Sequence, residues 1–155
     1  MKDVTEVLAA RLLGVAHIGF IVQNLEDSLE QFTRVYGLDM NTVDFQPPGE
    51  EPAPTRFAFF SVAGLNFELI EPCSAQFKEQ LLGMPSGGAG INHIAWRVDD
   101  IEAAVDLLAE RDIRPGHVTP DGIIAIGPRK MVYLDPATTG GQVIELIQYP
   151  PEGAA

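Results

Sequence analysis

The sequence has little cysteine and few basic residues, and each shortage makes some compartments or binding partners unlikely. Its single cysteine, Cys73, cannot form an internal disulfide, which fits a reducing compartment. Lys and Arg number 10 against 22 Asp and Glu, so the formal net charge is −12. Nucleic-acid binding needs a basic surface that displaces counterions, and an anionic membrane surface attracts basic proteins. We therefore expect neither nucleic acid nor a membrane as a partner.

Long apolar runs are also missing. No stretch approaches the ~20 apolar residues that a membrane-spanning helix needs. Asp3 and Glu6 precede only a short apolar segment, so the N-terminus is not typical of a secretory signal. We expect a cytoplasmic protein. The chain has 155 residues, of which 46% are hydrophobic, which suits one domain or two small modules that share a core.

An internal repeat organises the chain. Residues 14–18 (GVAHI) resemble residues 90–94 (GINHI), so His17 has a counterpart 76 residues later in His93. The triplet that begins at Glu68 (ELI) recurs 77 residues later at Glu145. A histidine and a glutamate that recur in the same order and in similar contexts indicate two related halves.

Each half begins with a β-rich segment followed by a helical pattern. The segments 14–22 and 90–98 predict strands, and Asn24 and Asp100 are suitable N-caps for the helices that follow. Gly37 suits the end of the first helix. The remaining short strands are expected at 39–45, 55–62 and 65–71 in the first half, and at 114–118, 123–126, 129–134 and 141–148 in the second. This order predicts an α+β fold of two tandem β-α-β-β-β modules.

The repeat also sets the expected domain boundaries. An amphipathic helix is expected near the N-terminus, within residues 1–13, and a frayed tail at 149–155. Between them we expect a single domain, 14–148, built from module 14–72 and module 90–148. Pro- and Gly-rich loops at 46–54 and 83–90 interrupt the pattern.

Strand alternation places the repeated histidines away from the helices. Side chains two residues apart share a strand face, so the apolar helix-facing set of the first strand is Ala16, Ile18, Phe20 and Val22. His17 then lies on the opposite face with Gly19. By the same rule His93 shares a face with Ala95 and Arg97.

The glutamates predict a metal site. Glu68 and Glu145 each lie inside an apolar strand, where a carboxylate is costly unless something satisfies it. One divalent ion bound by His17, Glu68, His93 and Glu145 would do so, and two nitrogens with two oxygens suit Zn, Ni, Co, Mn or Fe(II). The alternative is that the histidines are ordinary strand residues and the glutamates face solvent. That alternative explains any one residue well, but it leaves the shared symmetry of all four unexplained.

The paired modules resemble the vicinal oxygen chelate superfamily over residues 14–148. This group includes glyoxalase I, extradiol dioxygenases, antibiotic resistance proteins and methylmalonyl-CoA epimerase, and the sequence resembles the epimerases most. The stretches that carry the resemblance are 15–19 (VAHIG), 68–72 (ELIEP), 90–95 (GINHIA), 98–103 (VDDIEA) and 138–141 (TTGG) ahead of Ile144. The resemblance implies a sheet curved into a U around one metal site.

The resemblance also implies a chemistry. A metal-dependent epimerase or isomerase would remove a proton next to a carbonyl, with the ion stabilising the resulting charge. Glu145 would be one acid or base as well as a ligand. The second lies in a loop that holds Glu50 and Glu51 here; we favour Glu51, although a solvated acidic loop is an equally good interpretation of either residue.

Two positions depart from the epimerase pattern. The epimerases usually have an amide where Glu68 stands and a histidine where Asn92 stands. Two carboxylates neutralise a divalent ion and weaken its attraction for an anionic substrate. Arg97 could compensate by binding a substrate carboxylate with its planar fork, or it could be an ordinary surface arginine.

Other functions remain open at this point. The first choice is an epimerase acting on a CoA thioester, although the net charge is unfavourable for CoA phosphates. The basic residues available to meet those phosphates are Arg111, Arg114, Arg129 and Lys130. The alternatives are a glyoxalase-like isomerase or lyase on a small keto or hydroxy acid, and a non-catalytic resistance-type binding protein. By resemblance we expect a homodimer.

Overall fold

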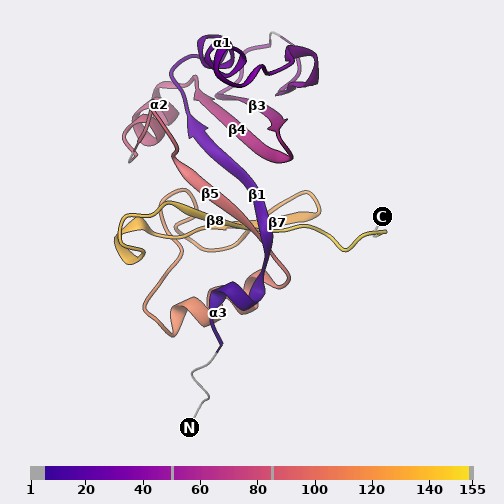
Figure 1. The fold of residues 1–155 in the computed structure, drawn as a ribbon. Helices are drawn as coiled ribbons and strands as arrows, with labels where there is room; N and C mark the ends of the chain where they lie inside the picture. The colour runs from indigo at the N-terminus through magenta and orange to yellow at the C-terminus, as the bar shows by residue number, and fades with distance from the viewer. Residues whose placement is uncertain (1–5, 50, 85, 154–155) are drawn as a thin grey trace. The chain divides into compact units, whose positions relative to one another are not determined.

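The computed structural model describes residues 6–49, 51–84 and 86–153 (Figure 1). Contacts between Cα atoms divide the chain into two compact units. The continuous unit is His17–His93, and the discontinuous unit joins Met1–Ala16 to Ile94–Ala155. The boundary lies inside two strands, because the first strand begins in the discontinuous unit and ends in the continuous one.

The continuous unit is a four-stranded sheet with two helices. Its elements in chain order are β1 (Leu12–Ile21, from His17 onward), α1 (Leu25–Tyr36), the 3-10 helix η2 (Met40–Thr42), β2 (Asp44–Gln46), β3 (Thr55–Val62), β4 (Leu65–Pro72) and α2 (Ala75–Leu82). The strand order is β2-β3-β4-β1, in which β1 and β4 are parallel and the other neighbours antiparallel. Helix α1 lies beside β3 and β4 (Figure 1).

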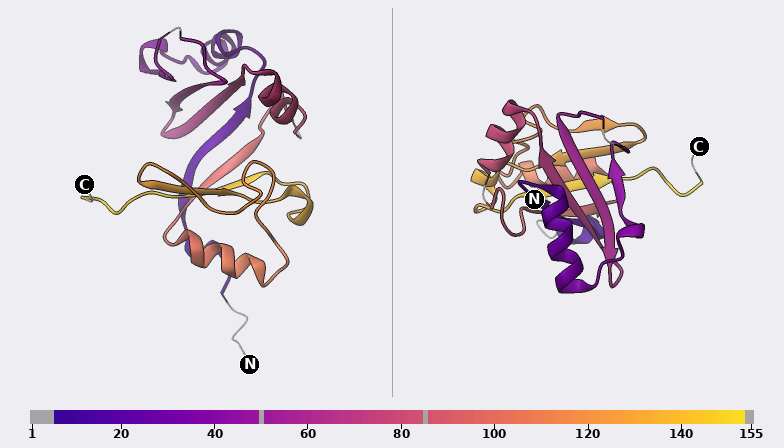
Figure 2. Two further views of the ribbon diagram at one scale, coloured as in Figure 1. Left: turned by 180° about the vertical axis from the view of Figure 1, so that it is seen from behind. Right: turned by 90° about the horizontal axis from the view of Figure 1, so that it is seen from above.

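The discontinuous unit repeats this order. Its elements are η1 (Leu8–Arg11), the start of β1, β5 (His93–Val98), α3 (Ile101–Ala109), β6 (Ile124–Ile126), β7 (Arg129–Tyr133), η3 (Pro136–Thr138) and β8 (Ile144–Gln148). The strand order is β5-β8-β7-β6, with β5 and β8 parallel. The left view of Figure 2 shows α3 beside the strands of this unit. Each half is therefore a β-α-β-β-β module, as the repeat predicts, except that one expected strand of the second half is reduced to a single bridge.

The helices begin and end where the sequence indicates. The Asn24 side chain accepts a hydrogen bond from the Asp27 N–H at the start of α1, and Asp100 accepts one from Ala103 at the start of α3. These bonds satisfy N–H groups that have no partner within the helix. Helix α1 ends at Gly37, whose φ of 73° is the left-handed conformation that glycine adopts without strain.

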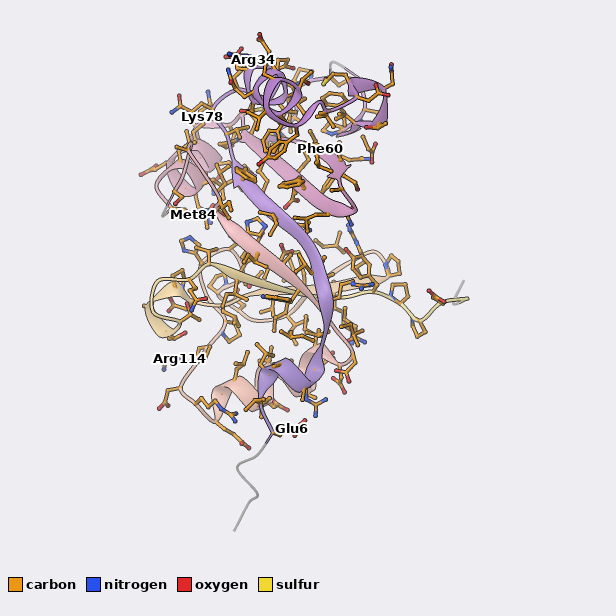
Figure 3. The ribbon with its side chains drawn as sticks, in the orientation of Figure 1. Glu6, Arg34, Phe60, Lys78, Met84 and Arg114 are labelled. Carbon is orange, nitrogen blue, oxygen red and sulfur yellow. The ribbon has the colours of Figure 1, made fainter. Side chains whose placement is uncertain are left out.

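Each unit has its own core between helix and sheet. In the continuous unit, Leu25, Leu29 and Leu69 are buried together, and Ile18 and Phe20 of β1 pack against them. Phe60 lies among the aromatic rings beneath α1, 5.1 Å from the Phe32 ring centroid, whereas Arg34 points outward (Figure 3). The expected helix-facing side of β1 is therefore confirmed for Ile18, Phe20 and Val22.

The core of the discontinuous unit is equivalent. Val98, Ile101, Leu108, Val132 and Leu146 form it, with Trp96 packed against them. Ala16 differs from the expectation, because it packs with Ala95 and Ile147 rather than under a helix. None of the helices in the described part of the chain is both long and apolar enough to cross a membrane.

Three expected elements differ. The predicted strand 114–118 is reduced to one isolated bridge between Pro115 and Leu134, because the Thr119 N–H bonds to the Gly116 carbonyl at 3.1 Å and turns the chain away. The expected N-terminal helix is, within its described part, a single 3-10 turn, Leu8–Arg11, since Leu12 already begins β1. Helix α2 was not predicted, and β2 is shorter than the expected 39–45 because a 3-10 turn occupies Met40–Thr42.

Candidate metal centre

Three of the four predicted ligands meet on one face of the continuous unit. The parallel pairing of β1 with β4 places Gly19 opposite Glu68, so His17, two residues before Gly19, shares the face of Glu68. The chain returns to this face just before β5, where the Asn92 N–H donates to the Gly19 carbonyl at 2.8 Å. The next residue, His93, is thereby brought against β1.

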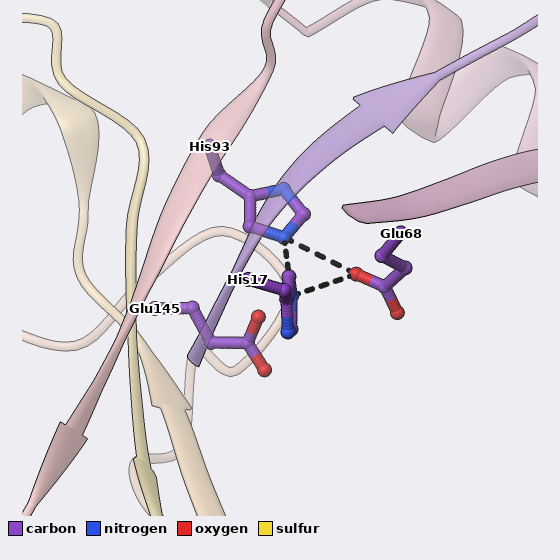
Figure 4. Close-up of side chains that lie close together, drawn as sticks. All are labelled: His17, Glu68, His93 and Glu145. Carbon is purple, nitrogen blue, oxygen red and sulfur yellow. Dashed lines mark hydrogen bonds and ion pairs between the residues drawn. The ribbon is translucent and has the colours of Figure 1, made fainter. Parts of the chain in front are cut away.

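The three side chains contact one another directly (Figure 4). His17 Nε2 lies 2.9 Å from Glu68 Oε2, and His93 Nε2 lies 3.3 Å from the same oxygen. The two Nε2 atoms are 3.2 Å apart, and the rings meet edge to face with centroids 5.3 Å apart. Two imidazole nitrogens and a carboxylate oxygen thus point at one small volume.

Burial and hydrogen bonding shift the pKa of the Glu68 carboxyl group in opposite directions. All three residues are buried, with exposed fractions of 8% for His17, 8% for Glu68 and 2% for His93. Burial alone would raise the pKa of Glu68, but the hydrogen bonds from His17 and His93, with their charge, lower it to about 2. Glu68 is therefore a carboxylate at neutral pH, which is the form that binds a metal ion.

Glu145 belongs to the discontinuous unit. On β8 it lies opposite Ala95 of β5 and Tyr133 of β7, and it is 4% exposed. Ala95 shares a strand face with Arg97, two residues later, so Glu145 is on the face of Arg97. Within the continuous unit, His17, Glu68 and His93 form a buried group that could hold a metal ion (Figure 4). Glu145 as the fourth ligand stays a prediction.

The separations fit one ion. Metal–ligand bonds of about 2.0–2.2 Å place neighbouring ligand atoms about 3.0–3.5 Å apart. The separations of 2.9, 3.2 and 3.3 Å among His17, Glu68 and His93 agree with this range. Imidazole and carboxylate donors suit intermediate divalent metals. The spacing of these three ligand atoms therefore fits a divalent metal ion.

The predicted second acid or base lies elsewhere. Glu51 lines a surface pocket of about 710 Å³ together with Arg56 and Cys73. Arg56 pairs with Glu71 across the β3–β4 ladder, and Glu71 is three residues beyond Glu68, so this pocket is on the other face of the sheet. The structure does not bring Glu51 to the histidines, and Glu50 lies outside the described residues. The role of Glu51 stays a prediction.

Cys73 in the same pocket is not an activated thiol. Burial raises the pKa of its thiol, and the nearby Glu71 carboxylate raises it further, outweighing the opposing effect of Arg56. This agrees with the expectation that Cys73 is an ordinary small residue.

Arg97 occupies the expected face of β5. It lies opposite Ile147 in the ladder, two residue pairs beyond Glu145, and its side chain is exposed. Its guanidinium approaches the Leu13 carbonyl at 3.5 Å. Arg97 shares the face of Glu145. Its role in binding substrate stays a prediction.

Two further residues shape the site without being ligands. Asn92 Oδ1 lies 2.8 Å from His93 Nδ1, and Gly19 lies directly beneath the His93 ring. The sequence predicts no role for either residue in metal binding. For Asn92 the available signal was its position directly before a repeated histidine.

The family follows from comparison with known sequences. The model of the Glyoxalase/Bleomycin resistance protein/Dioxygenase superfamily matches residues 16–133. This match covers more than half of the chain and includes three of the four residues of the site. The chain belongs to this superfamily.

Curated relatives within the superfamily include named epimerases. The chain is 28% identical over 132 residues to the mitochondrial methylmalonyl-CoA epimerase of Dictyostelium discoideum, covering 84% of this chain and 75% of the relative. It is 29% identical over 139 residues to the ethylmalonyl-CoA/methylmalonyl-CoA epimerase of Cereibacter sphaeroides, covering 85% and 95%. An uncharacterised protein of Bacillus subtilis, YqjC, is 26% identical over 135 residues, covering 85% and 89%.

Solved structures establish the fold. The methylmalonyl-CoA epimerase of Mycobacterium tuberculosis matches with a TM-score of 0.65 at 21% identity, covering 96% of each chain. A methylmalonyl-CoA epimerase in complex with methylmalonyl-CoA and ammonium matches with a TM-score of 0.63 at 18% identity, covering 90% and 96%. The α+β fold expected from the sequence is confirmed.

Proposed function

We propose that this superfamily member is a metal-dependent epimerase that moves a proton at the carbon next to a carbonyl, with a CoA thioester of the methylmalonyl type as substrate. The observation that carries the proposal is the buried His/Glu cluster in a chain whose curated relatives are named epimerases. A ligand set of this kind has a direct use in that reaction.

The ligands in this proposal are His17, Glu68, His93 and Glu145, and the ion is Co, Mn, Ni, Zn or Fe. When bound, the ion stabilises the negative charge that develops on the substrate oxygens as the α-proton leaves. The low exposure of the cluster strengthens this interaction, because little water is present to screen it.

The chain supplies the proton acceptor. Glu145 is a buried carboxylate at a position predicted to bind the ion, so it is our candidate base at the α-carbon. An epimerase also needs a group that returns a proton from the opposite side. Glu51 is our candidate for that group, and it would have to reach the substrate from a pocket on the other face of the sheet.

The basic residues available for CoA phosphates are fewer than the sequence suggests. Lys130 is paired with Glu102 at 2.5 Å, and Arg111 donates to the Leu107 carbonyl at 2.9 Å. Arg114 and Arg129 are exposed and remain the better candidates. Arg97 would bind the free carboxylate of the acyl group.

The deciding experiment follows hydrogen exchange. The protein is loaded with Co(II) or Mn(II), given methylmalonyl-CoA in heavy water, and deuterium at the α-carbon is followed by mass spectrometry. We expect rapid exchange in the parent protein and loss of at least about a hundredfold in Glu145→Gln, the lower end of the range for removing a general base. Glu51→Gln, measured in parallel, tests the second group. His117→Ala is the control, because His117 is exposed and outside the cluster. No exchange in a fully metal-loaded protein would contradict the epimerase proposal.

A second function is favoured by Glu68. Its carboxylate, with that of Glu145, neutralises a divalent ion, which suits a less highly charged substrate than a CoA thioester. The alternative is a glyoxalase-like isomerase or lyase on a small keto or hydroxy acid. Exchange with small keto or hydroxy acids and none with methylmalonyl-CoA would favour it. The metal-binding cluster argues against a non-catalytic resistance-type protein.

Two further proposals concern the protein as a whole. We propose that it forms a homodimer, by resemblance to other members of the superfamily, and that it acts in the cytoplasm, which its single cysteine fits. Light scattering on the purified protein and fractionation of the source cells test these two proposals separately.

A further inference from the structure

The His93 imidazole is held by neighbours that are not candidate ligands. It is 2% exposed, so its ring has almost no contact with solvent. One nitrogen, Nε2, points to Glu68 Oε2 at 3.3 Å. The other, Nδ1, lies 2.8 Å from the side-chain oxygen of Asn92. The two nitrogens therefore have different partners.

The partner of Nδ1 determines which nitrogen can bind a metal. An amide oxygen only accepts hydrogen bonds, so a short contact with Asn92 Oδ1 requires a hydrogen on Nδ1. A histidine binds a metal ion as the neutral imidazole, which has one N–H, so with the hydrogen on Nδ1 the lone pair of metal-bound His93 is on Nε2. That nitrogen is the one directed at Glu68 and His17.

Asn92 is itself fixed in place. It is 7% exposed, and its backbone N–H donates to the Gly19 carbonyl at 2.8 Å. In the first half of the repeat the equivalent residue is Ala16, which has no polar side chain. The amide beside the histidine is therefore a feature of the second half alone.

Gly19 provides the space for the ring. A Cβ added at this position would overlap the Cε1, Nε2 and Nδ1 atoms of His93. The backbone of Gly19 does not have the positive φ that favours glycine at other positions of this chain. The requirement for glycine here is therefore the close approach of the imidazole to β1.

We infer that Gly19 and Asn92 are positioning residues that hold the His93 ring against β1 and direct its Nε2 to the metal. Gly19 admits the ring, and Asn92 fixes both its rotation and the location of its hydrogen. This inference rests on the proposed metal site. It adds two residues, neither of which touches the ion, whose loss would weaken metal binding.

The test measures metal affinity and the state of the ring, not turnover. Zn(II) affinity is determined by competition with a chromophoric chelator for the parent protein and for Asn92→Leu, Asn92→Asp and Gly19→Ala. Proton–nitrogen correlation spectra of the zinc-loaded, 15N-histidine-labelled protein then report the His93 Nδ1–H. The chain has three histidines, so the assignment is tractable with a His117→Asn variant.

We expect Asn92→Leu to weaken zinc binding by about 10–100-fold, the range found when the hydrogen-bond partner of a metal-bound histidine is removed. The protected Nδ1–H signal of His93 should disappear in the same variant. Asn92→Asp, which keeps an acceptor of the same length, should restore both. Gly19→Ala should weaken binding at least as much, because the ring must move.

Several outcomes would overturn the inference. Unchanged zinc affinity in Asn92→Leu, or a hydrogen on Nε2 in the zinc-loaded parent protein, would each contradict it. Asn41→Leu is the control for asparagine replacement, since Asn41 is exposed on η2. Circular dichroism separates loss of folding from loss of affinity, and Asn92→Asp keeps the inference testable if the leucine variant does not fold. Absence of epimerase activity would contradict only the proposed function, because these readouts need no substrate.

Discussion

Glu71 and Gln148 each hold the start of a helix by a side-chain hydrogen bond, one in each half of the molecule. Glu71 Oε2 accepts a hydrogen bond from the Leu25 N–H at 2.7 Å, and Gln148 Oε1 accepts one from the Ile101 N–H at 2.8 Å. Each bond satisfies the first N–H of the helix in its own half, α1 or α3. The two residues are 77 apart, the same interval that separates Glu68 from Glu145. The last strand of each half thus anchors its helix three residues after it places a candidate ligand.

Removing this anchor should destabilise the protein. We expect Glu71→Leu to lower the free energy of unfolding by about 1–3 kcal/mol, because it leaves the Leu25 N–H without its acceptor and removes a 3.3 Å contact with Arg56. Glu71→Gln should cost less, since Gln148 shows that an amide can fill this position. Urea unfolding followed by circular dichroism measures all three proteins. Equal stability of Glu71→Leu and the parent protein would show that the bond contributes nothing.

Metal stoichiometry should separate the histidines into two classes. We expect His17→Ala and His93→Ala to lose bound metal after dialysis against a weak chelator. His117→Ala should retain it, because His117 is exposed and outside the cluster. Elemental analysis by mass spectrometry gives the metal per chain. Retention of a full equivalent in both cluster variants would rule out the proposed site.

Metal removal should lower thermal stability. A ligand that binds only the folded state stabilises it by RT ln(1 + [L]/Kd), about 4 kcal/mol at a thousandfold excess over Kd. We therefore expect Tm to fall on adding a strong chelator and to recover with excess Zn(II). Scanning calorimetry of the parent protein and of Glu68→Ala provides the comparison. A chelator that shifts both proteins equally would show that the effect does not come from this site.

The core beneath α1 should be sensitive to truncation. Leu29 is 1% exposed and packs in the cluster that contains Leu25 and Leu69. We expect Leu29→Ala to lower the free energy of unfolding by about 2–5 kcal/mol, through lost burial and the cavity left behind. Val35→Ala on the same helix is the control, since Val35 is 69% exposed and should change stability by less than about 0.5 kcal/mol. Chemical denaturation measures both.

Arg97 should affect substrate affinity more than chemistry. If its planar fork binds the carboxylate of the acyl group, Arg97→Lys should raise KM by about tenfold with little change in kcat, because the two-point contact is lost. Arg34→Lys on the outer side of α1 is the control (Figure 3). Steady-state epimerisation assays distinguish the two parameters. An unchanged KM for Arg97→Lys would leave the residue without a role in binding.

The internal repeat made much of the fold predictable. It located β1, β5, α1 and α3, because helix caps and strand alternation agree in both halves. It did not reveal α2, where Ser74 caps the helix but Leu81 is the only helix residue that is buried, so the apolar periodicity is weak. The strand expected at 114–118 was wrong because the segment contains Pro115 and Gly116, and the chain turns at Gly116.

For the site, too, the sequence predicted the residues that the repeat covers and not the others. The repeat predicted that His17, Glu68, His93 and Glu145 form one site, because the two histidines occupy equivalent strands and so do the two glutamates. Glu51 had no repeat partner, and its position depends on a loop whose course local sequence does not determine. Gly19 could not be recognised either, since the atoms that require glycine there belong to a residue 74 positions later.

The division of the chain into units has a consequence for synthesis on the ribosome. The continuous unit, His17–His93, is complete once its last residue has emerged, so its sheet and helices can assemble while the rest is being translated. The discontinuous unit is completed later, because Ala16 packs in one cluster with Ile147, and β8, which carries Ile147, is the last strand to be translated. During most of translation the start of β1, residues 12–16, therefore lacks the last strand of the unit in which it packs in the folded protein.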